Sequence, residues 1–382
     1  MLEPTLMPIP CQRHLFDIPE GIAYFDCATI SPLLLGAHAA SCNGQRRELH
    51  PWNITAEDWF SDAEAIRSIA ARLILAGPES IAVIPGATYG VAVAAANIPV
   101  AKGQEILTLT GQHTANSYSW HRVARESGAT VREIHRSKSS DWTTAVLEAI
   151  TPATALAAFP HVHSTDGAPI DLVAIGSALR AQGAALVVDA THSLGAREFD
   201  VRAIRPDFMV AGGYKWLLGP YGTGLMYVSP SYHSGRSIEE PGLNRLGSEN
   251  FESNVAHLDV YKPGARRFDF ASKGNFGLLP GLRFALELLE NWSISSVERT
   301  LMSMTGQIAT ELQSLPNSGI QEINAHSHYV GVKLSEHKRT KLNERLALAC
   351  VYASVRGDWL RVTPHVYNSQ TDIERLLDVV SG

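Results

Sequence analysis

The sequence predicts an α/β protein, in which a large domain with a mostly parallel, seven-stranded sheet is followed by a smaller α+β C-terminal domain. Three observations lead to this prediction. Short apolar segments alternate with helical patterns from about Ala63 to Ser229, as they do in consecutive βαβ units. A polar, irregular segment begins after Pro230. The length of 382 residues also exceeds that of one ordinary hydrophobic core.

The seven predicted strands are short, apolar and bounded by Gly, Pro or polar residues. They cover residues 80–85, 105–110, 130–135, 155–159, 184–189, 208–211 and 224–229. Helical patterns between them include residues 62–76, 116–127 and 172–182. Because a helical crossover joins one parallel strand to the next, this alternation predicts a largely parallel sheet.

The second part of the chain begins after a segment rich in Gly, Ser, Asn and Arg, residues 231–273, which we expect to connect the domains over the surface. Further helices are predicted at residues 279–291, 295–315, 338–349 and 371–380. The segments VYASV and WLRVT flank Arg356-Gly357-Asp358 and predict a β-hairpin. We place the large domain at residues 22–250 and the small one at 1–21 together with 251–382.

Composition and charge exclude several classes of partner. The chain is 45% hydrophobic and 18% charged, and its net charge of −6 is scattered, which argues against nucleic acid or a membrane. No run of eighteen apolar residues could span a bilayer, and MLEPTLMPIP does not resemble a signal peptide. Cysteines 11, 27, 42 and 350 have no disulfide or metal-site spacing. We therefore expect a cytoplasmic protein that binds a small molecule and no metal.

Distinctive residues follow two early strands, at the edge where open parallel sheets bind ligands. PGATYG, residues 85–90, precedes an alanine-rich helix, so the amides of Gly86, Ala87 and Thr88 could hold a phosphate. A plain turn in which Thr88 caps the helix would give the same pattern. The segment TGQHTAN, residues 110–116, contains His113. This histidine could lie over an aromatic ligand or shuttle protons, and the alternative is an exposed loop histidine.

Two charged residues stand in apolar surroundings further along. Asp189 ends an apolar segment, so its carboxylate needs a cation or strong donors, and His192 is a candidate donor. A helix cap is the other role open to Asp189. Lys215 stands between an apolar segment and a glycine-rich turn; unless it is a surface lysine, such a site lowers its pKa and favours a Schiff base with a carbonyl. Together with a phosphate-type turn and a histidine, these residues match the needs of pyridoxal phosphate.

These residues resemble the class V aminotransferase-like family of fold-type I pyridoxal-phosphate enzymes, which includes cysteine desulfurases, kynureninases and isopenicillin N epimerase. The resemblance runs from IAYFDCATISPL, residues 22–33, to WLRVTPHVYNSQTDIERLL, residues 359–377, and is most specific at residues 187–229. It implies the cofactor pyridoxal 5′-phosphate, bound as an aldimine to Lys215 of the motif YKWLLGP. It also implies a homodimer.

The resemblance implies a role for each matching residue around the cofactor. Asp189 would pair with the pyridine nitrogen, and His113 would cover the ring. Thr88, with the amides around it, would bind the phosphate, and Tyr214 would reach it. His192 stands where desulfurases more often have Gln, whereas kynureninase-like and epimerase-like members tend to have His. On the substrate side, Arg361 would grip the carboxylate through its planar fork, with Ala28 nearby.

The chain also departs from the family pattern. Ala87 and Gly212 replace residues that often supply phosphate-binding hydroxyls, and Ser164 stands where many members have an Asn close to the cofactor ring. ASKGN, residues 271–275, replaces a loop that usually reaches the phosphate of the neighbouring subunit. There, Lys273 either supplies charge or is a solvated loop lysine. These departures put individual phosphate contacts in question, and the cofactor prediction stands.

The sequence therefore predicts a pyridoxal-phosphate enzyme that acts at the α-carbon of an amino acid, with Lys215 as acid or base, and as a lyase, aminotransferase or epimerase. A cysteine desulfurase or selenocysteine lyase-like activity is the alternative. It needs a mobile cysteine, and Cys350, the C-terminal candidate, is expected to be a packed core thiol. A non-catalytic cofactor-binding or interaction protein is the alternative from another class. A nicotinamide dehydrogenase is disfavoured because G-x-G-x-x-G is missing.

Overall fold

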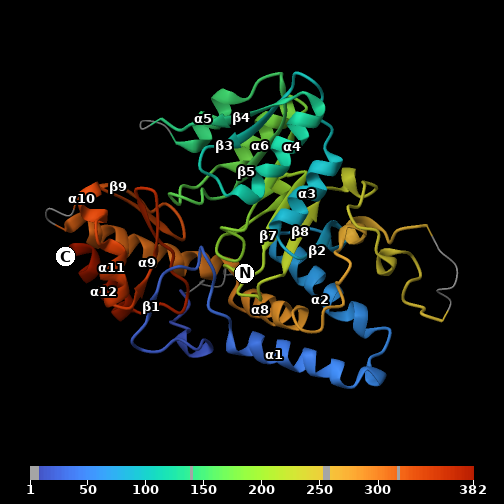
Figure 1. Cartoon of the computed structure of the whole chain (residues 1–382), viewed down its shortest axis with the longest axis horizontal. Coiled ribbons are helices and arrows are strands. Elements are labelled where there is room, and N and C mark those ends of the chain that lie inside the picture. Colours follow the sequence, from blue (N-terminus) through green and yellow to red (C-terminus); the bar gives the residue numbers. More distant parts are fainter. Residues whose placement is uncertain (1–7, 138–140, 253–258, 316–318) are drawn as a thin grey trace, which may run out of the picture.

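The computed structural model describes residues 8–137, 141–252, 259–315 and 319–382. A seven-stranded sheet in the order β2-β8-β7-β6-β5-β3-β4 forms its centre (Figure 1). Its strands are β2 (Ile81–Ile84), β3 (Glu105–Leu109), β4 (Thr130–Ile134), β5 (Thr154–Pro160), β6 (Ala185–Asp189), β7 (Phe208–Gly212) and β8 (Gly224–Val228). These are the seven predicted strands, and no end differs from the prediction by more than one residue.

Strand β8 alone runs against the other six, because it pairs antiparallel with both β7 and β2 while the remaining pairs are parallel. The turn from β7 into β8 contains Lys215. Strands β5 to β8 are buried along their whole length, and their residues alternate between two hydrophobic clusters. Val187 and Val210 face one cluster, whereas Val188 and Met209 face the other. The mostly parallel sheet is thus covered on both faces, which explains its nearly continuous apolar strands.

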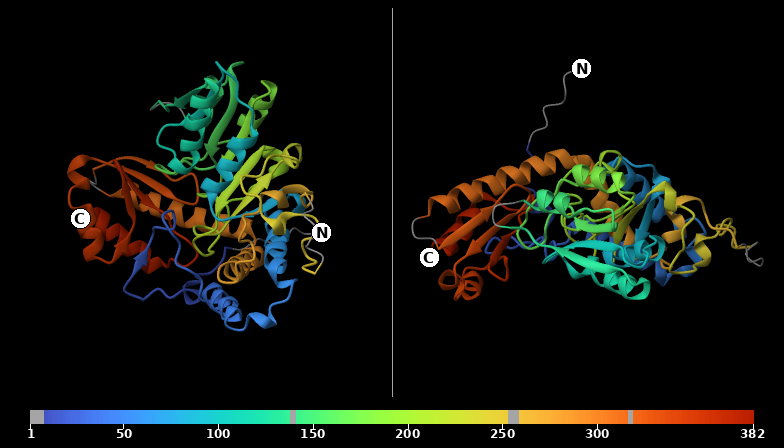
Figure 2. Two further views of the ribbon diagram at one scale, coloured as in Figure 1. Left: turned by 45° about the vertical axis from the view of Figure 1, so that its right-hand side comes forward. Right: turned by 90° about the horizontal axis from the view of Figure 1, so that it is seen from above.

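Helices lie on both faces of the large sheet (Figure 2), and their buried side chains belong to the two clusters. Those of the first two-thirds of the chain are α1 (Leu35–Arg46), α2 (Asp58–Leu73), α3 (Ala87–Asn97), α4 (Tyr118–Ser127), α5 (Trp142–Ala149), α6 (Leu172–Ala181) and α7 (Val201–Ile204). Helices α3 and α4 cover one face, and α2, α5 and α6 cover the other. Gly90 lets α3 approach β7 closely, since a Cβ there would lie 2.4 Å from Val210 Cγ1. Helix α1 was not predicted.

The C-terminal elements form a separate lobe beside the large sheet, orange to red in Figure 1. They are α9 (Ile294–Ser314), β9 (Ile320–Asn324), β10 (Val330–Leu334), α10 (Glu336–Arg339), α11 (Leu342–Leu348), β11 (Val351–Tyr352), β12 (Ser354–Arg356), β13 (Trp359–Val362) and α12 (Gln370–Ser381). A four-stranded antiparallel sheet in the order β12-β13-β10-β9 supports a third hydrophobic cluster. The predicted α+β character of this part is confirmed.

Two predictions in this lobe need correction. The helix predicted at residues 338–349 is divided into α10 and α11, because Lys341 adopts a left-handed conformation with φ of 62°. The hairpin around Gly357 is present between β12 and β13. Val351 and Tyr352, however, leave it and pair in parallel with β1 (Ala23–Tyr24), so the N-terminal segment docks on this lobe. Strands β9 and β10 were not predicted.

Helix α8 (Leu279–Trp292) packs into the core beneath the large sheet, although its sequence position suggested the second domain. Helix α9 then reaches both cores, with Leu301 in the large cluster and Leu312 in the C-terminal one.

The domain limits at residues 22–250 and 251–382 stay a prediction. Short 3-10 helices cover Arg13–Leu15, Arg47–Leu49, Pro51–Asn53, Pro78–Ser80, Thr114–Asn116, Pro230–Tyr232, Gly242–Asn244 and Gly264–Phe268. Within the described ranges, no helix is both long and apolar enough to cross a membrane.

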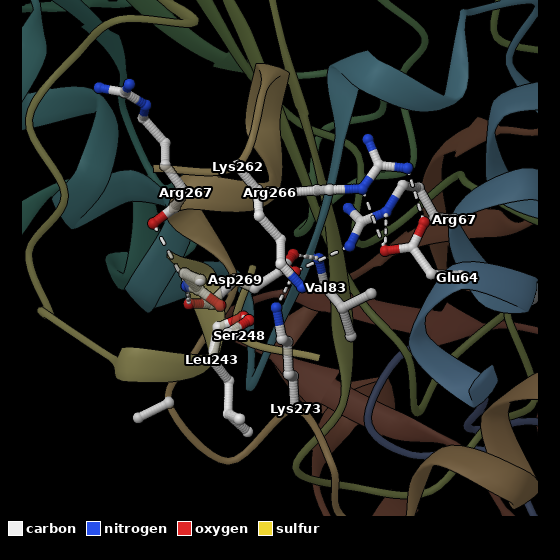
Figure 3. Close-up of polar contacts among 12 residues, drawn as sticks. Glu64, Arg67, Val83, Leu243, Ser248, Lys262, Arg266, Arg267, Asp269 and Lys273 are labelled. Carbon is white, nitrogen blue, oxygen red and sulfur yellow. Dashed lines mark hydrogen bonds and ion pairs between the residues drawn. The ribbon is translucent and has the colours of Figure 1, made fainter. Parts of the chain in front are cut away.

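The connection at residues 231–273 is more than a surface segment, because several of its polar side chains are buried. The carboxylate of Asp269 pairs with Arg67 Nη2 at 2.7 Å and with Lys273 Nζ at 3.3 Å, and it accepts a hydrogen bond from the amide of Val83 (Figure 3). Lys273 is 2% exposed, so it is neither a solvated loop lysine nor directed away from its own subunit. We call Arg67, Asp269 and Lys273 the buried charge cluster.

Candidate active site

A cavity of about 200 Å³ lies beyond the ends of β2, β3, β6 and β7. Its position agrees with the rule that open parallel sheets bind ligands at the carboxyl ends of their strands. It is lined by Pro85, Gly86, Ala87, Thr88, His113, Ala115, Asp189, Thr191, His192, Tyr214, Lys215, Tyr221 and Gly222. All the residues that the sequence assigned to the cofactor line this cavity except Ser164.

Lys215 is 4% exposed and reaches this cavity from the turn after β7. Burial lowers the pKa of its amine to about 8; the carboxylate of Asp189 opposes this shift, and the charge of Arg361 contributes to it. The amine therefore loses its proton far more readily than an ordinary lysine. It is not a surface lysine, and about a tenth of it is in the nucleophilic neutral form at pH 7.

His192 is the direct partner of Lys215, with 2.9 Å between His192 Nε2 and Lys215 Nζ. Burial, and then the nearby Lys215, hold the pKa of His192 well below its usual range, so its ring is neutral. The ammonium of Lys215 donates to Nε2, which assigns the ring hydrogen to Nδ1. In the described part of the chain this buried Nδ1 has no hydrogen-bond partner. A buried donor without a partner indicates a place for a ligand.

Asp189 ends β6 and is 5% exposed. Its Oδ1 accepts a hydrogen bond of 3.0 Å from the amide of Thr191, and the hydroxyl of Thr191 accepts one of 3.1 Å from the amide of Gly212. Thr191 thus ties the ends of β6 and β7 together and orients the carboxylate. The sequence offered His192 as the donor to Asp189; the structure directs the His192 Nε2 atom to Lys215 instead.

The amino end of α3 and His113 complete the cavity. Gly86 is the N-cap of α3 and has no side chain that could accept a hydrogen bond from the first amides of the helix. These amides face the cavity. The helix dipole also favours an anion there. His113 Nδ1 accepts a hydrogen bond of 3.2 Å from the amide of Ala115, and burial followed by the charge of Lys215 lowers the pKa of its ring. His113 is therefore neutral.

A second pocket of about 350 Å³ adjoins the cavity and shares His113, His192, Tyr214 and Lys215 with it. Its other lining residues are Ala28, Thr29, Gly111, Gln112, Thr114, Ser164, Thr165, Arg356 and Arg361. Ala28 and Arg361, which the sequence assigned to the substrate, both line it, and Ser164 lies here rather than in the smaller cavity. The carbonyl of Ser164 accepts a hydrogen bond of 2.9 Å from Arg361 Nη1.

Sequence reasoning missed two kinds of site residue. Thr191 could have been found, because it stands two residues after the strand-end carboxylate that its amide contacts. Thr29 and Tyr221 in turns, and Arg356 at the end of β12, are brought to the pockets only by the folded chain, so no local pattern indicates them. No group of three or more His, Cys, Asp or Glu side chains in the described ranges is placed to hold a metal ion.

The cysteines lie outside both pockets, and all four belong to the described residues. Cys350 is exposed between α11 and β11, so the expectation of a packed core thiol is wrong. Its φ of 53° places it in the left-handed region, at the turn between these two elements. Cys27 is fully buried close to Lys215, and burial raises the pKa of its thiol far above the usual range. Such a thiol is inert.

The arrangement fits pyridoxal phosphate in three respects. A neutralisable lysine amine faces the cavity, a buried carboxylate lies beside it, and unpaired donors are present at the amino end of α3 and at His192 Nδ1. The amine suits an aldehyde, the carboxylate suits a protonated ring nitrogen, and the helix end suits a phosphate. The chain thus offers a complementary group for each reactive part of this cofactor.

Comparison with known proteins independently indicates a pyridoxal-phosphate enzyme. A family model described as aminotransferase class-V matches residues 41–376. A probable cysteine desulfurase from Pyrococcus abyssi is 28% identical over 73% of this chain and 72% of its own length. Isopenicillin N epimerase from Streptomyces clavuligerus is 32% identical over 57% of this chain and 52% of its own length.

Solved structures share the fold over nearly the whole chain. The apo cysteine desulfurase from Thermococcus onnurineus NA1 superposes with a TM-score of 0.80 at 19% identity and covers 98% of both chains. A mutant of C-DES with glycine covalently linked to its pyridoxal-phosphate cofactor superposes with a TM-score of 0.85 at 18% identity, covering 97% of this chain and 99% of that one. These likenesses establish the fold.

Proposed function

The chain belongs to the aminotransferase class-V family of pyridoxal-phosphate-dependent enzymes, and we propose that it makes and breaks bonds at the α-carbon of an amino acid through Lys215. When bound, pyridoxal phosphate supplies an aldehyde that reacts with amines and a ring that draws electrons from the neighbouring carbon. Thr88 and the amides of Gly86 and Ala87 would hold the phosphate, and Asp189 would face the ring nitrogen.

Lys215 does the chemistry that this chain itself supplies. Because its pKa is about 8, the amine can both take and give a proton at neutral pH. The neutral His192 accepts a hydrogen bond from Nζ and keeps the amine turned into the cavity. Arg361 lies in the adjoining pocket, where it would orient the substrate carboxylate. The observation that carries the proposal is the buried Lys215, whose pKa is depressed and whose cavity contains Asp189.

Reconstitution tests this proposal directly. The protein loaded with pyridoxal phosphate is expected to be yellow. Borohydride should remove the colour and fix the pyridoxyl group, as a stable label, on the peptide that contains Lys215. Label on another lysine, or a protein that does not take up the cofactor, would contradict the proposal. An amino-acid panel scored for ammonia, sulfide, keto acid and inversion at the α-carbon would then separate lyase, aminotransferase and epimerase activity.

Cysteine desulfurase activity is the second candidate, because the similar proteins include probable desulfurases. Persulfide transfer needs a thiol that reaches the substrate sulfur, whereas Cys350 lies outside both pockets and Cys27 is inert. We therefore expect Cys350→Ala to retain the wild-type release of sulfur from cysteine within about twofold, as for an exposed side chain remote from the reaction. The methylene blue assay for sulfide measures this, with dithiothreitol present. A loss of tenfold or more would establish the desulfurase mechanism.

Two further expectations belong to the same proposal. The resemblance supports a homodimer, which light scattering on a size-exclusion column would detect as a mass of twice 41.4 kDa. We also propose a cytoplasmic location, which fractionation of cells that produce a tagged protein would test.

A further inference from the structure

We propose that the substrate is an amino acid with an acidic side chain, and that Arg356 binds the anionic end of that side chain. This inference rests on the proposed function, because it places the reacting amine of the substrate at Lys215. It goes further by naming a substrate class and a residue that selects it. Four features of the two pockets support it.

The position of Arg356 is the first feature. Arg356 ends β12 at the tip of the hairpin and lines the 350 Å³ pocket together with Lys215 and Arg361. The pKa of His113 is lowered by burial and by nearby cations, Arg356 among them, and burial together with Arg356 also lowers the pKa of Arg361. The guanidinium of Arg356 therefore acts on the residues that surround the reacting position.

The state of its guanidinium is the second feature. Arg356 is exposed, and within the described ranges it has neither an ion pair nor a hydrogen bond from its side chain. Arg361 is different: Ser354 Oγ accepts hydrogen bonds from its Nε and Nη2, Thr29 Oγ1 also accepts from Nη2, and the carbonyl of Ser164 accepts from Nη1. Arg361 also has the carboxylate of Asp26 at 3.8 Å. Arg361 is thus held rigidly, as suits a constant α-carboxylate, whereas Arg356 is free to meet a variable group.

The charge of the pocket is the third feature. Lys215, Arg356 and Arg361 line it, and no Asp or Glu is among its lining residues. A neutral amino acid would bring a single carboxylate to two guanidinium groups. An acidic amino acid brings a second anion, and a charge-assisted bidentate contact with arginine is among the stronger hydrogen bonds in proteins. The balance of charge therefore favours a substrate with two acidic groups.

The space beyond Arg356 is the fourth feature. Gly111, Thr165 and Arg356 also line a further pocket of about 500 Å³, so a substrate side chain longer than that of alanine has room to extend past the reacting position. The acidic residues of this further pocket already have cationic partners. Asp166 and Glu322 pair with Arg136 at 3.1 and 3.5 Å, and Asp358 pairs with Lys333 at 3.3 Å. Among the described residues, Arg356 thus lies where the two pockets meet without a carboxylate partner.

Amino acids paired with their uncharged isosteres test this inference. We expect the wild-type enzyme to use L-glutamate or L-aspartate in preference to L-glutamine or L-asparagine, as measured by kcat/KM in each pair. Arg356→Gln should lower that preference about 10- to 100-fold, the range typical of a hydrogen bond to a charged group. Arg356→Lys should restore part of it, because it keeps the positive charge without the bidentate fork. Arg375→Gln removes the same charge from the same lobe outside the pockets, and should leave the preference unchanged.

A binding measurement gives a readout besides turnover. Glutarate lacks an amine and therefore does not react. Calorimetry on the cofactor-loaded enzyme measures its affinity and that of pentanoate, which has one carboxylate fewer. We expect glutarate to bind at least about tenfold more tightly, and Arg356→Gln to remove the difference. Equal binding of the two acids, or a preference for the amides in wild-type turnover, would overturn the inference. Failure of borohydride to label Lys215 would instead overturn the proposed function, since cofactor capture does not depend on Arg356.

Discussion

Lys215 and Lys273 are among the buried lysines of the described residues, and their surroundings differ. Lys215 is 4% exposed and Lys273 is 2% exposed, and burial lowers the pKa of both amines. Lys273 forms an ion pair with Asp269, which also holds Arg67, in a region without a cavity among those described above. Lys215 contacts a neutral histidine and lines a cavity. Burial is common to both sites, but the counter-ion and the empty space are not.

This difference shows how the fold separates a structural charge from a reactive one. The carboxylate of Asp269, 3.3 Å from Lys273 Nζ, opposes the lowering of the Lys273 pKa by burial and pairs with the amine, which makes Lys273 a poor nucleophile. The neutral His192 does not stabilise an ammonium as a carboxylate would, so Lys215 gives up its proton more readily. A buried lysine is therefore a candidate nucleophile only where no carboxylate pairs with it and a ligand can reach it. Three predictions test this comparison.

The largest effect is expected when each lysine is removed in turn. Lys215→Ala should lower kcat about 1,000-fold or more, because it removes both the nucleophile and the proton carrier, and it should abolish borohydride labelling. Lys273→Met should leave labelling intact, because Asp269 keeps its pair with Arg67. Turnover and labelling are measured on both variants after circular dichroism has verified their folding. Labelling that survives in Lys215→Ala would break the comparison.

A smaller effect, on stability, is expected from Asp269→Asn. This change leaves Arg67 and Lys273 buried without their shared carboxylate, and should lower the free energy of unfolding by about 3–5 kcal/mol. Asp358→Asn breaks the pair with Lys333, which is partly exposed, and should cost less than about 1 kcal/mol. Urea unfolding measures both variants. Equal losses would show that the buried charge cluster contributes no more than a surface ion pair.

The smallest effect is a pH dependence of cofactor capture. The neutral amine is the reactive form, and a pKa of about 8 means that its fraction grows as the pH rises through that value. Between pH 7 and pH 9 the initial rate of capture by the apoprotein should rise about tenfold and then level off. Stopped-flow absorbance follows this rate. A rate that continues to rise up to pH 10.5 would assign Lys215 the pKa of an ordinary lysine.

Much of the site was predictable from sequence because parallel sheets bring strand ends together. Asp189 follows a buried strand and Lys215 follows the next one, so one edge of the sheet collects both. The apolar runs of β5 to β8 identify those strands on their own, because both faces of each strand are buried. Helix α1 and strand β9 escaped prediction because their sequences are largely polar. Strand β10 also escaped prediction, although it is as long as most of the predicted strands.

The sequence by itself determined the seven strands of the large sheet, the edge where the reactive residues meet and the chemical type of those residues. These follow from local patterns, because apolar periodicity and turn residues act over a few positions. Only the tertiary structure decided that Lys273 pairs with Asp269, that Cys350 is exposed and that Arg356 lies unpaired between two pockets. Burial, ion pairing and access depend on segments far apart in the chain, so no local pattern contains them.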